Sequence, residues 1–170
     1  ELFSLALPGA PVVLFLSRVH PQKCAEVLVD AVSLLKDRLV DCNLFIAGPG
    51  ENEYIESLER RAAKRGVGDR TRLLGMVTGR MKASLYQLAQ VFAHPSAQES
   101  FGLVLAEAMA CGTPAVTTKG VDIWPELEAG RATWLAERTP EAFAGALGRL
   151  MGDPALRAEL AGSGRAWVAE

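Results

Sequence analysis

Residues 91–118 read VFAHPSAQESFGLVLAEAMACGTPAVTT, and this stretch predicts a strand, a helix and a second strand in succession. The apolar run 91–94 is stopped by Pro95, the helix expected at 103–111 is closed by Gly112, and another apolar run follows at 115–118. Short links between a strand, a helix and the next strand are typical of a parallel sheet. The stretch therefore indicates an α/β fold.

The same alternation continues on both sides of this stretch. Further strands are expected at residues 12–16, 42–47, 71–74 and 132–135, and further helices at 25–39, 51–65, 82–89, 140–151 and 154–168. Residues 12–16 are apolar throughout, which suits a strand buried on both faces of a sheet. We predict a doubly wound, Rossmann-like parallel sheet with helices on both faces. It would occupy residues 12–170, after a linker at 1–11 marked by prolines and glycine.

The composition is that of an ordinary globular protein. Of 170 residues, 49% are hydrophobic and 22% are charged, and the net charge is −2. No basic surplus favours nucleic acid as a partner, and no apolar run reaches the length of a membrane helix. The expected location is the cytoplasm, and a longer protein could lie against the inner face of a membrane. The first residues resemble no signal peptide and suggest the cut end of a longer protein.

The cysteines and histidines do not indicate a metal site, a disulfide or a catalytic residue. Cys24, Cys42 and Cys111 are scattered without a C-x-x-C pair, so free thiols are expected rather than a zinc site or disulfides. His94 has apolar neighbours at a strand end, which favours a packed or capped ring over an acid–base role. His20 precedes a proline and is interpreted as solvated. We assign neither histidine to a site.

Ligands of such sheets bind beyond the carboxyl ends of the strands, so the loops after each strand are informative. Arg18 and Lys23 follow the first strand, and such a cation pair can hold a diphosphate, although a solvated basic loop is the alternative. That loop has no glycine, which argues against NAD or FAD. Gly48 and Gly50 follow the second strand and would let the backbone approach a ligand, or would simply form a turn.

Two glutamates frame the start of the helix after the fourth strand. Gly102 lies where free N–H groups and the helix dipole favour a phosphate, with Glu99 before it and Glu107 inside the helix. Carboxylates placed on either side could accept hydrogen bonds from hydroxyls of two sugars. The spacing alone is not specific, because Glu51 and Glu59 repeat it on what we interpret as a solvated helix face.

The pattern PSxxESFGLxLAEAMACGTP at residues 95–114 is similar to the most specific signature of the family-4 (group 1) retaining GT-B glycosyltransferases, including its EX7E motif. Arg18 and Lys23, the run 46–50 and the run 74–77 match further motifs of that family in the right order. The chain thus resembles the C-terminal, donor-binding half of such a hexosyltransferase. The family often has glycine at the positions of Ser17 and Cys24, and a glycine pair where this chain has Lys119 and Gly120.

The resemblance implies a role for each matching residue. Arg18 and Lys23 would neutralise the leaving diphosphate, and Glu99 would hold the transferred sugar near the reacting face. These three form the expected catalytic set. Glu107 would accept from the ribose, and backbone groups at the other positions would contact sugar, phosphate or base. The expected donor-binding residues are Gly48, Gly50, Met76, Val77, Ser100, Phe101, Gly102, Leu103 and Glu107.

The implied partner is a nucleotide-diphosphate sugar, which is the substrate, and neither a cofactor nor a metal is expected. The acceptor would be held by an N-terminal domain that this chain lacks, so the fragment is expected to bind nucleotide and transfer no sugar. The alternative is a degenerate nucleotide-binding or interaction module without catalysis. Retention of Arg18, Lys23, Glu99 and Glu107 together favours the transferase. The base, the sugar, the acceptor, the covalent or same-face mechanism and the oligomeric state stay open.

Overall fold

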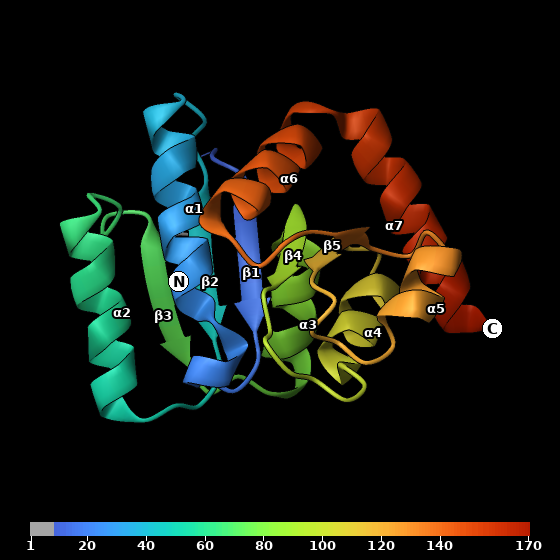
Figure 1. Ribbon diagram of the computed structural model, residues 1–170, viewed down its shortest axis with the longest axis horizontal. Helices are drawn as coiled ribbons and strands as arrows, with labels where there is room; N and C mark the ends of the chain where they lie inside the picture. The colour runs from blue at the N-terminus through green and yellow to red at the C-terminus, as the bar shows by residue number, and fades with distance from the viewer. Residues whose placement is uncertain (1–8) are drawn as a thin grey trace.

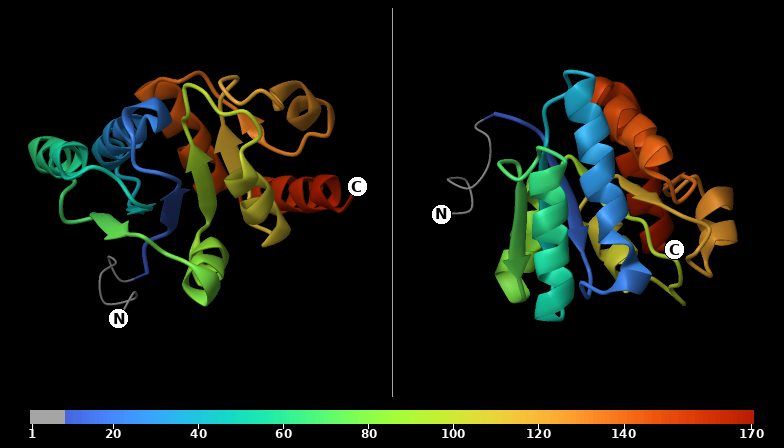
Figure 2. Two further views of the ribbon diagram at one scale, coloured as in Figure 1. Left: turned by 90° about the horizontal axis from the view of Figure 1, so that it is seen from below. Right: turned by 60° about the vertical axis from the view of Figure 1, so that its left-hand side comes forward.

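Strand β1 (Val12–Leu16) runs through the middle of the protein, and all five of its residues are buried. In the computed structural model, which describes residues 9–170, it belongs to a six-stranded sheet in the order β3-β2-β1-β4-β5-β6, shown in Figures 1 and 2. The other strands are β2 (Asn43–Ala47), β3 (Thr71–Gly75), β4 (Val91–His94), β5 (Ala115–Thr117) and β6 (Trp134–Leu135). Every pairing in this sheet is parallel, so the predicted fold class is confirmed.

Helices cover both faces of the sheet because consecutive strand residues point to opposite sides. Val13 and Phe15 belong to a core with α1 (Ala25–Asp37), α2 (Asn52–Lys64) and α6 (Pro140–Gly152). Leu14 and Leu16 belong to a second core with α3 (Gly79–Leu88), α4 (Leu103–Ala110) and α5 (Trp124–Ala129). Helix α7 (Pro154–Ala169) packs against the first core near its start and the second near its end.

The order in which strands are added to the sheet reverses between β1 and β4. Strands β2 and β3 extend to one side of β1, and β4, β5 and β6 extend to the other. The loops that follow β1 and β4 therefore start from adjacent strand ends at this switch point, which is where ligands of such sheets bind. The tertiary structure thus brings together the loops that hold Arg18, Lys23 and Glu99.

Most predicted elements agree with the structure, and the differences have local causes. The first helix ends at Asp37 rather than 39, because Leu39 takes a left-handed conformation with φ of 59°. Helix α3 begins earlier than expected, at Gly79. Helix α5 was not predicted, since its six residues are too short for a periodic pattern. Strand β6 is shorter than the predicted 132–135.

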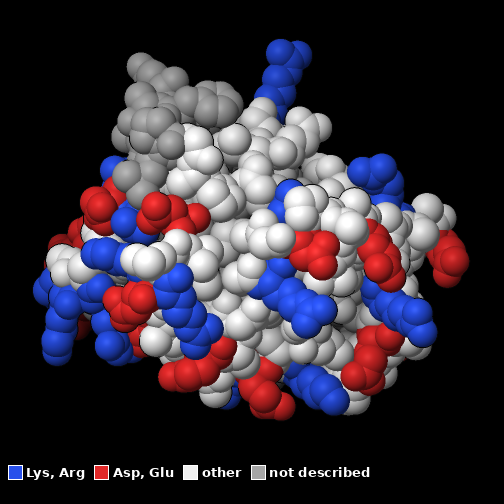
Figure 3. All heavy atoms as spheres, turned by 90° about the horizontal axis from the view of Figure 1, so that it is seen from above, with Lys and Arg blue, Asp and Glu red and all other residues white. Residues whose placement is uncertain are grey.

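The linker interpretation of residues 1–11 falls largely on residues 1–8, which lie outside the described part of the chain. Between residues 9 and 170, no helix has both the length and the apolar character needed to cross a bilayer. Figure 3 shows the end of the sheet opposite to the β1 and β4 loops, where acidic and basic side chains are interspersed rather than separated.

Candidate functional site

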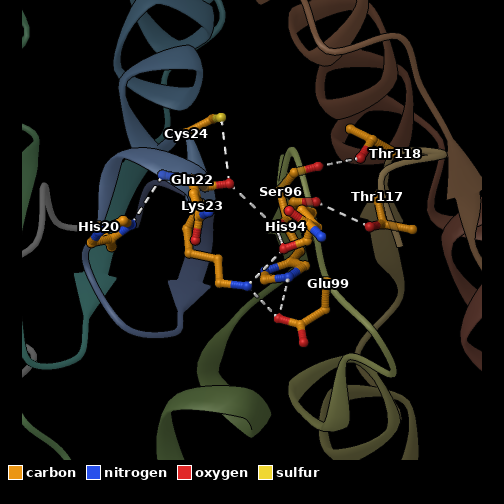
Figure 4. Close-up of polar contacts among 10 residues, drawn as sticks. His20, Gln22, Lys23, Cys24, His94, Ser96, Glu99, Thr117 and Thr118 are labelled. Carbon is orange, nitrogen blue, oxygen red and sulfur yellow. Dashed lines mark hydrogen bonds and ion pairs between the residues drawn. The ribbon is translucent and has the colours of Figure 1, made fainter. Parts of the chain in front are cut away.

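An ion pair joins the loops after β1 and β4. Lys23 ends a short 3-10 helix (Pro21–Lys23), and its side chain is buried although it carries a charge. Its Nζ donates to Glu99 Oε2 at 2.6 Å and to the carbonyl oxygen of Gln98 at 3.0 Å (Figure 4). A lysine ammonium carries three N–H donors, so these two bonds leave one for a further acceptor. In this arrangement one N–H of Lys23 stays available to an anion.

Backbone contacts fix the Glu99 loop from both sides. On the β1 side, Ala97 N–H donates to the Gln22 carbonyl at 2.8 Å. On the β5 side, Glu99 N–H donates to the Gly120 carbonyl at 2.9 Å, and Glu99 carbonyl accepts from Asp122 N–H at 2.8 Å. A Cβ on Gly120 would lie 2.4 Å from the Ser96 carbonyl oxygen, so this close approach requires glycine. The loop that presents Glu99 is therefore held rigidly.

The electrostatics keep Glu99 ionised. Burial by itself raises the pKa of the Glu99 carboxyl, but the hydrogen bond and charge of Lys23 outweigh burial and hold the pKa below its usual value. The backbone N–H of Gly102 adds to this lowering. Glu99 is thus a carboxylate that can accept hydrogen bonds from hydroxyl groups.

His94 is packed, as the sequence predicts, but it also faces Glu99. Its ring is 0% exposed and lies nearly parallel to the rings of Phe15 and Phe92, with centroid distances of 6.2 and 6.1 Å. Its Nε2 is 3.7 Å from Glu99 Oε2. Burial lowers the pKa of His94 to about 4, although the Glu99 carboxylate opposes this shift. His94 is therefore a neutral ring beside a carboxylate.

Arg18 lies exposed in the same loop as Lys23, one residue before the buried Val19. Val19 N–H donates to the Pro49 carbonyl at 2.8 Å, which joins the loop after β1 to the loop after β2. The predicted pairing of Arg18 with a diphosphate stays a prediction. Its exposure leaves the guanidinium accessible to a ligand.

Gly48 and Gly50 are required for the packing of two loops. A Cβ on Gly48 would lie 1.7 Å from the Ser17 carbonyl oxygen, and a Cβ on Gly50 would lie 2.4 Å from the Val19 carbonyl oxygen. Gly48 also has φ of 138°, a conformation that other residues rarely adopt. The structure thus explains both glycines by close approach to the first loop. A direct contact of either with a donor stays a prediction.

Glu107 has partners of its own. Lys82 Nζ lies 2.7 Å from Glu107 Oε1 and 2.6 Å from Oε2, and the Tyr86 hydroxyl donates to Oε2 at 2.8 Å. Burial, together with this carboxylate, raises the pKa of Tyr86. The three side chains line a cavity of about 280 Å³. Sequence analysis did not single out Lys82 and Tyr86, although their spacing of four places them on one face of a helix.

The remaining predicted residues lie at the start of α4 and after β3. Gly102 is the N-cap of α4 with φ of 73°, and Phe101 and Leu103 beside it are 49% and 68% exposed. Ser100 is exposed as well. Met76, 72% exposed, and the partly buried Val77 follow β3. The Gly75 carbonyl before them accepts from Gly48 N–H at 2.7 Å, which ties this turn to the second loop.

A larger cavity of about 580 Å³ lies beyond the ends of β5 and β6. Ala97 of the Glu99 loop contributes to its wall, together with Arg138 and Thr139 just before α6. Lys119 also lines this cavity, and its Nζ lies 4.2 Å from the centroid of the Trp124 ring. The cavity therefore adjoins the loop that carries Glu99, two residues before the carboxylate.

The cysteines are free, as predicted, with Cys24 and Cys42 buried and Cys111 partly buried. Cys24 has φ of 54°, a left-handed conformation that glycine adopts more easily. In residues 9–170, no group of three or more His, Cys, Asp or Glu side chains could hold a metal ion. That the site works without a metal stays a prediction. The Glu51 and Glu59 pair is exposed, in agreement with its interpretation as a solvated face.

Comparison with known families agrees with the arrangement of these loops. A family model described as glycosyl transferases group 1 matches residues 3–167. The chain belongs to the group 1 glycosyltransferases. A D-inositol 3-phosphate glycosyltransferase of Xylanimonas cellulosilytica is 38% identical over 166 residues, covering 95% of the chain and 39% of that relative. Its counterpart in Jonesia denitrificans is 33% identical over 164 residues, covering 93% of the chain and 39% of the relative. The chain therefore spans less than half the length of these curated relatives.

Solved glycosyltransferase structures share the fold. Sucrose-phosphate synthase of Thermosynechococcus elongatus superposes with a TM-score of 0.85 at 29% identity, covering 96% of the chain and 42% of that protein. HepE of Anabaena, solved with UDP and glucose, superposes with a TM-score of 0.85 at 24% identity, covering 94% of the chain and 44% of HepE. The C-terminal domain of the group 1 protein LpcC of Francisella tularensis superposes with a TM-score of 0.84 at 22% identity. The match covers 96% of the chain and 86% of that domain. The sheet is thus one half of a GT-B fold, as the sequence resemblance implied.

Proposed function

We propose that this group 1 domain binds a nucleotide-diphosphate sugar and presents its sugar for retaining transfer to an acceptor. The observation that carries the proposal is the Lys23–Glu99 pair, with 2.6 Å between Nζ and Oε2 at the switch point of the sheet. One short contact places a cation suited to a diphosphate beside a carboxylate suited to sugar hydroxyls. HepE, which has the same fold, was solved with UDP and with UDP-glucose.

Each residue then acts at a definite part of the donor. Lys23 and the exposed Arg18 compensate the charge that builds on the diphosphate as its bond to the anomeric carbon breaks. Free N–H groups at the start of α4 favour the same charge. Glu99 accepts from sugar hydroxyls. The acceptor oxygen forms the new bond to the anomeric carbon, and its proton passes to the departing diphosphate. Glu107, oriented by Lys82 and Tyr86, accepts from the ribose.

We further propose that the acceptor is held by an N-terminal domain of a longer protein. The support is that the chain covers only 39% of its curated relatives and 44% of HepE. The donor domain by itself then binds nucleotide and transfers no sugar. We place this activity in the cytoplasm and expect no metal to be required, because Lys23, Arg18 and the helix start balance the diphosphate.

Calorimetric titration of the 170-residue chain with UDP, GDP and ADP tests the proposal. We expect at least one diphosphate to bind, with an affinity that falls as salt rises from low to physiological ionic strength. Glu107→Gln should weaken this binding, whereas the matched change Glu59→Gln on the solvated face of α2 should not. Absence of binding by all three nucleotides at millimolar concentration would contradict the proposed function.

A further inference from the structure

His94 combines two features that packing alone does not require. Its ring is 0% exposed, and neither ring nitrogen has a hydrogen-bond partner within residues 9–170. Leaving a buried polar group without a partner costs folding free energy. A phenyl ring, like those of the neighbouring Phe15 and Phe92, would occupy this buried position without that cost. Packing in the donor-free protein therefore does not explain why this residue is a histidine. Its ring nitrogens are better suited to a hydrogen bond that forms when a donor binds.

His94 and Glu99 lie close to each other but do not form a hydrogen bond. The distance of 3.7 Å from Nε2 to Oε2 exceeds that of a hydrogen bond. It is also too short for a bridging water, which would need about 4.5 Å or more between the two atoms. The oxygen concerned is the one that Lys23 Nζ already holds at 2.6 Å. Lys23 and His94 thus converge on a single carboxylate oxygen (Figure 4).

The surroundings hold the ring in this orientation. The ring is fully buried and nearly parallel to two phenyl rings, with interplanar angles of 25° to Phe15 and 13° to Phe92. The Thr117 hydroxyl donates to the His94 carbonyl at 3.0 Å, which anchors the backbone at the end of β4. A small movement of the Glu99 side chain toward the ring is therefore enough to complete a hydrogen bond.

We propose that His94 is a positioning residue for Glu99: its Nε2–H takes over Oε2 when Lys23 turns toward the diphosphate. This inference rests on the proposed function, because the donor supplies the anion that draws Lys23 away. A neutral imidazole has one N–H donor, and beside a carboxylate the proton is favoured on the nitrogen that faces it. The exchange keeps the partly buried Glu99 carboxylate paired and aimed at the sugar while the ammonium serves the diphosphate.

The state of the His94 ring can be read by ¹⁵N NMR of the histidine-labelled chain, which has only two histidines. His20→Gln assigns the signals. We expect the His94 proton on Nε2 in the donor-free chain, and a downfield shift of that proton when UDP is added, as the hydrogen bond to Glu99 shortens. A proton on Nδ1 would overturn the inference, because Nε2 would then present a lone pair to the carboxylate.

A double-mutant cycle gives the functional readout. We expect His94→Phe to weaken UDP binding about three- to tenfold in the wild-type background and less than about twofold in Glu99→Gln, where no carboxylate needs a partner. His94→Gln, whose amide N–H reaches near the position of Nε2, should restore part of the loss. Equal weakening by His94→Phe in both backgrounds would show a purely structural role and overturn the inference.

The two proposals fail in different ways. If the wild-type chain binds none of UDP, GDP and ADP, the proposed function and the exchange fall together. If the wild-type chain binds and the cycle shows no coupling between His94 and Glu99, only the role of His94 falls. Should His94→Phe not fold by circular dichroism, the NMR measurement on the wild-type chain still decides the inference.

Discussion

Lys23 Nζ lies 2.6 Å from Glu99 Oε2, so the cation expected to serve the diphosphate is held, without donor, by the carboxylate expected to serve the sugar. The two residues are 76 positions apart in the chain and come from the loops after β1 and β4. Their assigned roles are consequently coupled: a donor that engages Lys23 also changes the electrostatic surroundings of Glu99.

Removal of the two cations should separate binding from stability. Arg18→Ala and Lys23→Ala should each weaken UDP binding by about 1–3 kcal/mol, the range for hydrogen bonds to charged groups. Only Lys23→Ala should also lower the free energy of unfolding, because it leaves the partly buried Glu99 carboxylate without its ammonium partner. Calorimetry and urea denaturation measure the two effects, with Lys64→Ala on α2 as control. Unchanged UDP affinity in the Arg18/Lys23 double variant would count against the assignment.

The two glutamates should respond differently to replacement by glutamine. Glu107→Gln should weaken UDP and UDP-glucose alike, because the ribose is part of both and supplies uniform binding. Glu99→Gln should leave UDP affinity at the wild-type level or improve it, since Lys23 is released, and should abolish the extra affinity contributed by the sugar. In the longer enzyme, the first change should mainly raise KM and the second should lower kcat strongly. Wild-type kinetics in both variants would refute the assignment of the motif.

Two glycine-to-alanine changes should have opposite effects on stability. Gly48→Ala places a Cβ 1.7 Å from the Ser17 carbonyl oxygen at a positive φ, so we expect a loss on the order of 3 kcal/mol or a failure to fold. Gly145 lies inside α6 with no atom within 4 Å of a built Cβ, so Gly145→Ala should stabilise by about 0.5–1 kcal/mol. Urea denaturation compares the two. A mild effect at Gly48 would mean that the loops after β1 and β2 can separate.

Burial of neutral His94 should make stability depend on pH. The folded pKa of about 4 lies below the ordinary 6.5, so between these values the unfolded chain binds more protons than the folded one. The contribution is fully present above pH 6.5 and is lost as pH falls toward 4, on the order of 3 kcal/mol in total. His94→Phe should remove this slope and His20→Gln should keep it. An identical slope in wild type and His94→Phe would locate the dependence elsewhere.

Local patterns in the sequence predicted most of the fold and part of the candidate site. The all-apolar run at residues 12–16 predicts a doubly buried strand because every side chain in it avoids water. Prolines and glycines mark the ends of helices because they restrict or free a single backbone position. Arg18, Lys23 and Glu99 could be singled out because strand ends of a parallel sheet lie at one edge. Glu107, inside the following helix, was assigned through the resemblance of its motif to a known family. All of these arguments act over a few neighbouring residues.

The tertiary structure alone decided which side chains meet. The Lys23–Glu99 pair, the approach of His94 to the same oxygen and the Lys82–Tyr86 clamp on Glu107 depend on the register of separate strands and helices. No periodic pattern records such contacts, because hydrophobic spacing specifies which face of an element is buried but not which polar group from another element it faces. The sequence thus determined the sheet and the edge at which chemistry occurs, whereas the packing of loops far apart in the chain determined that its charges are paired before any donor arrives.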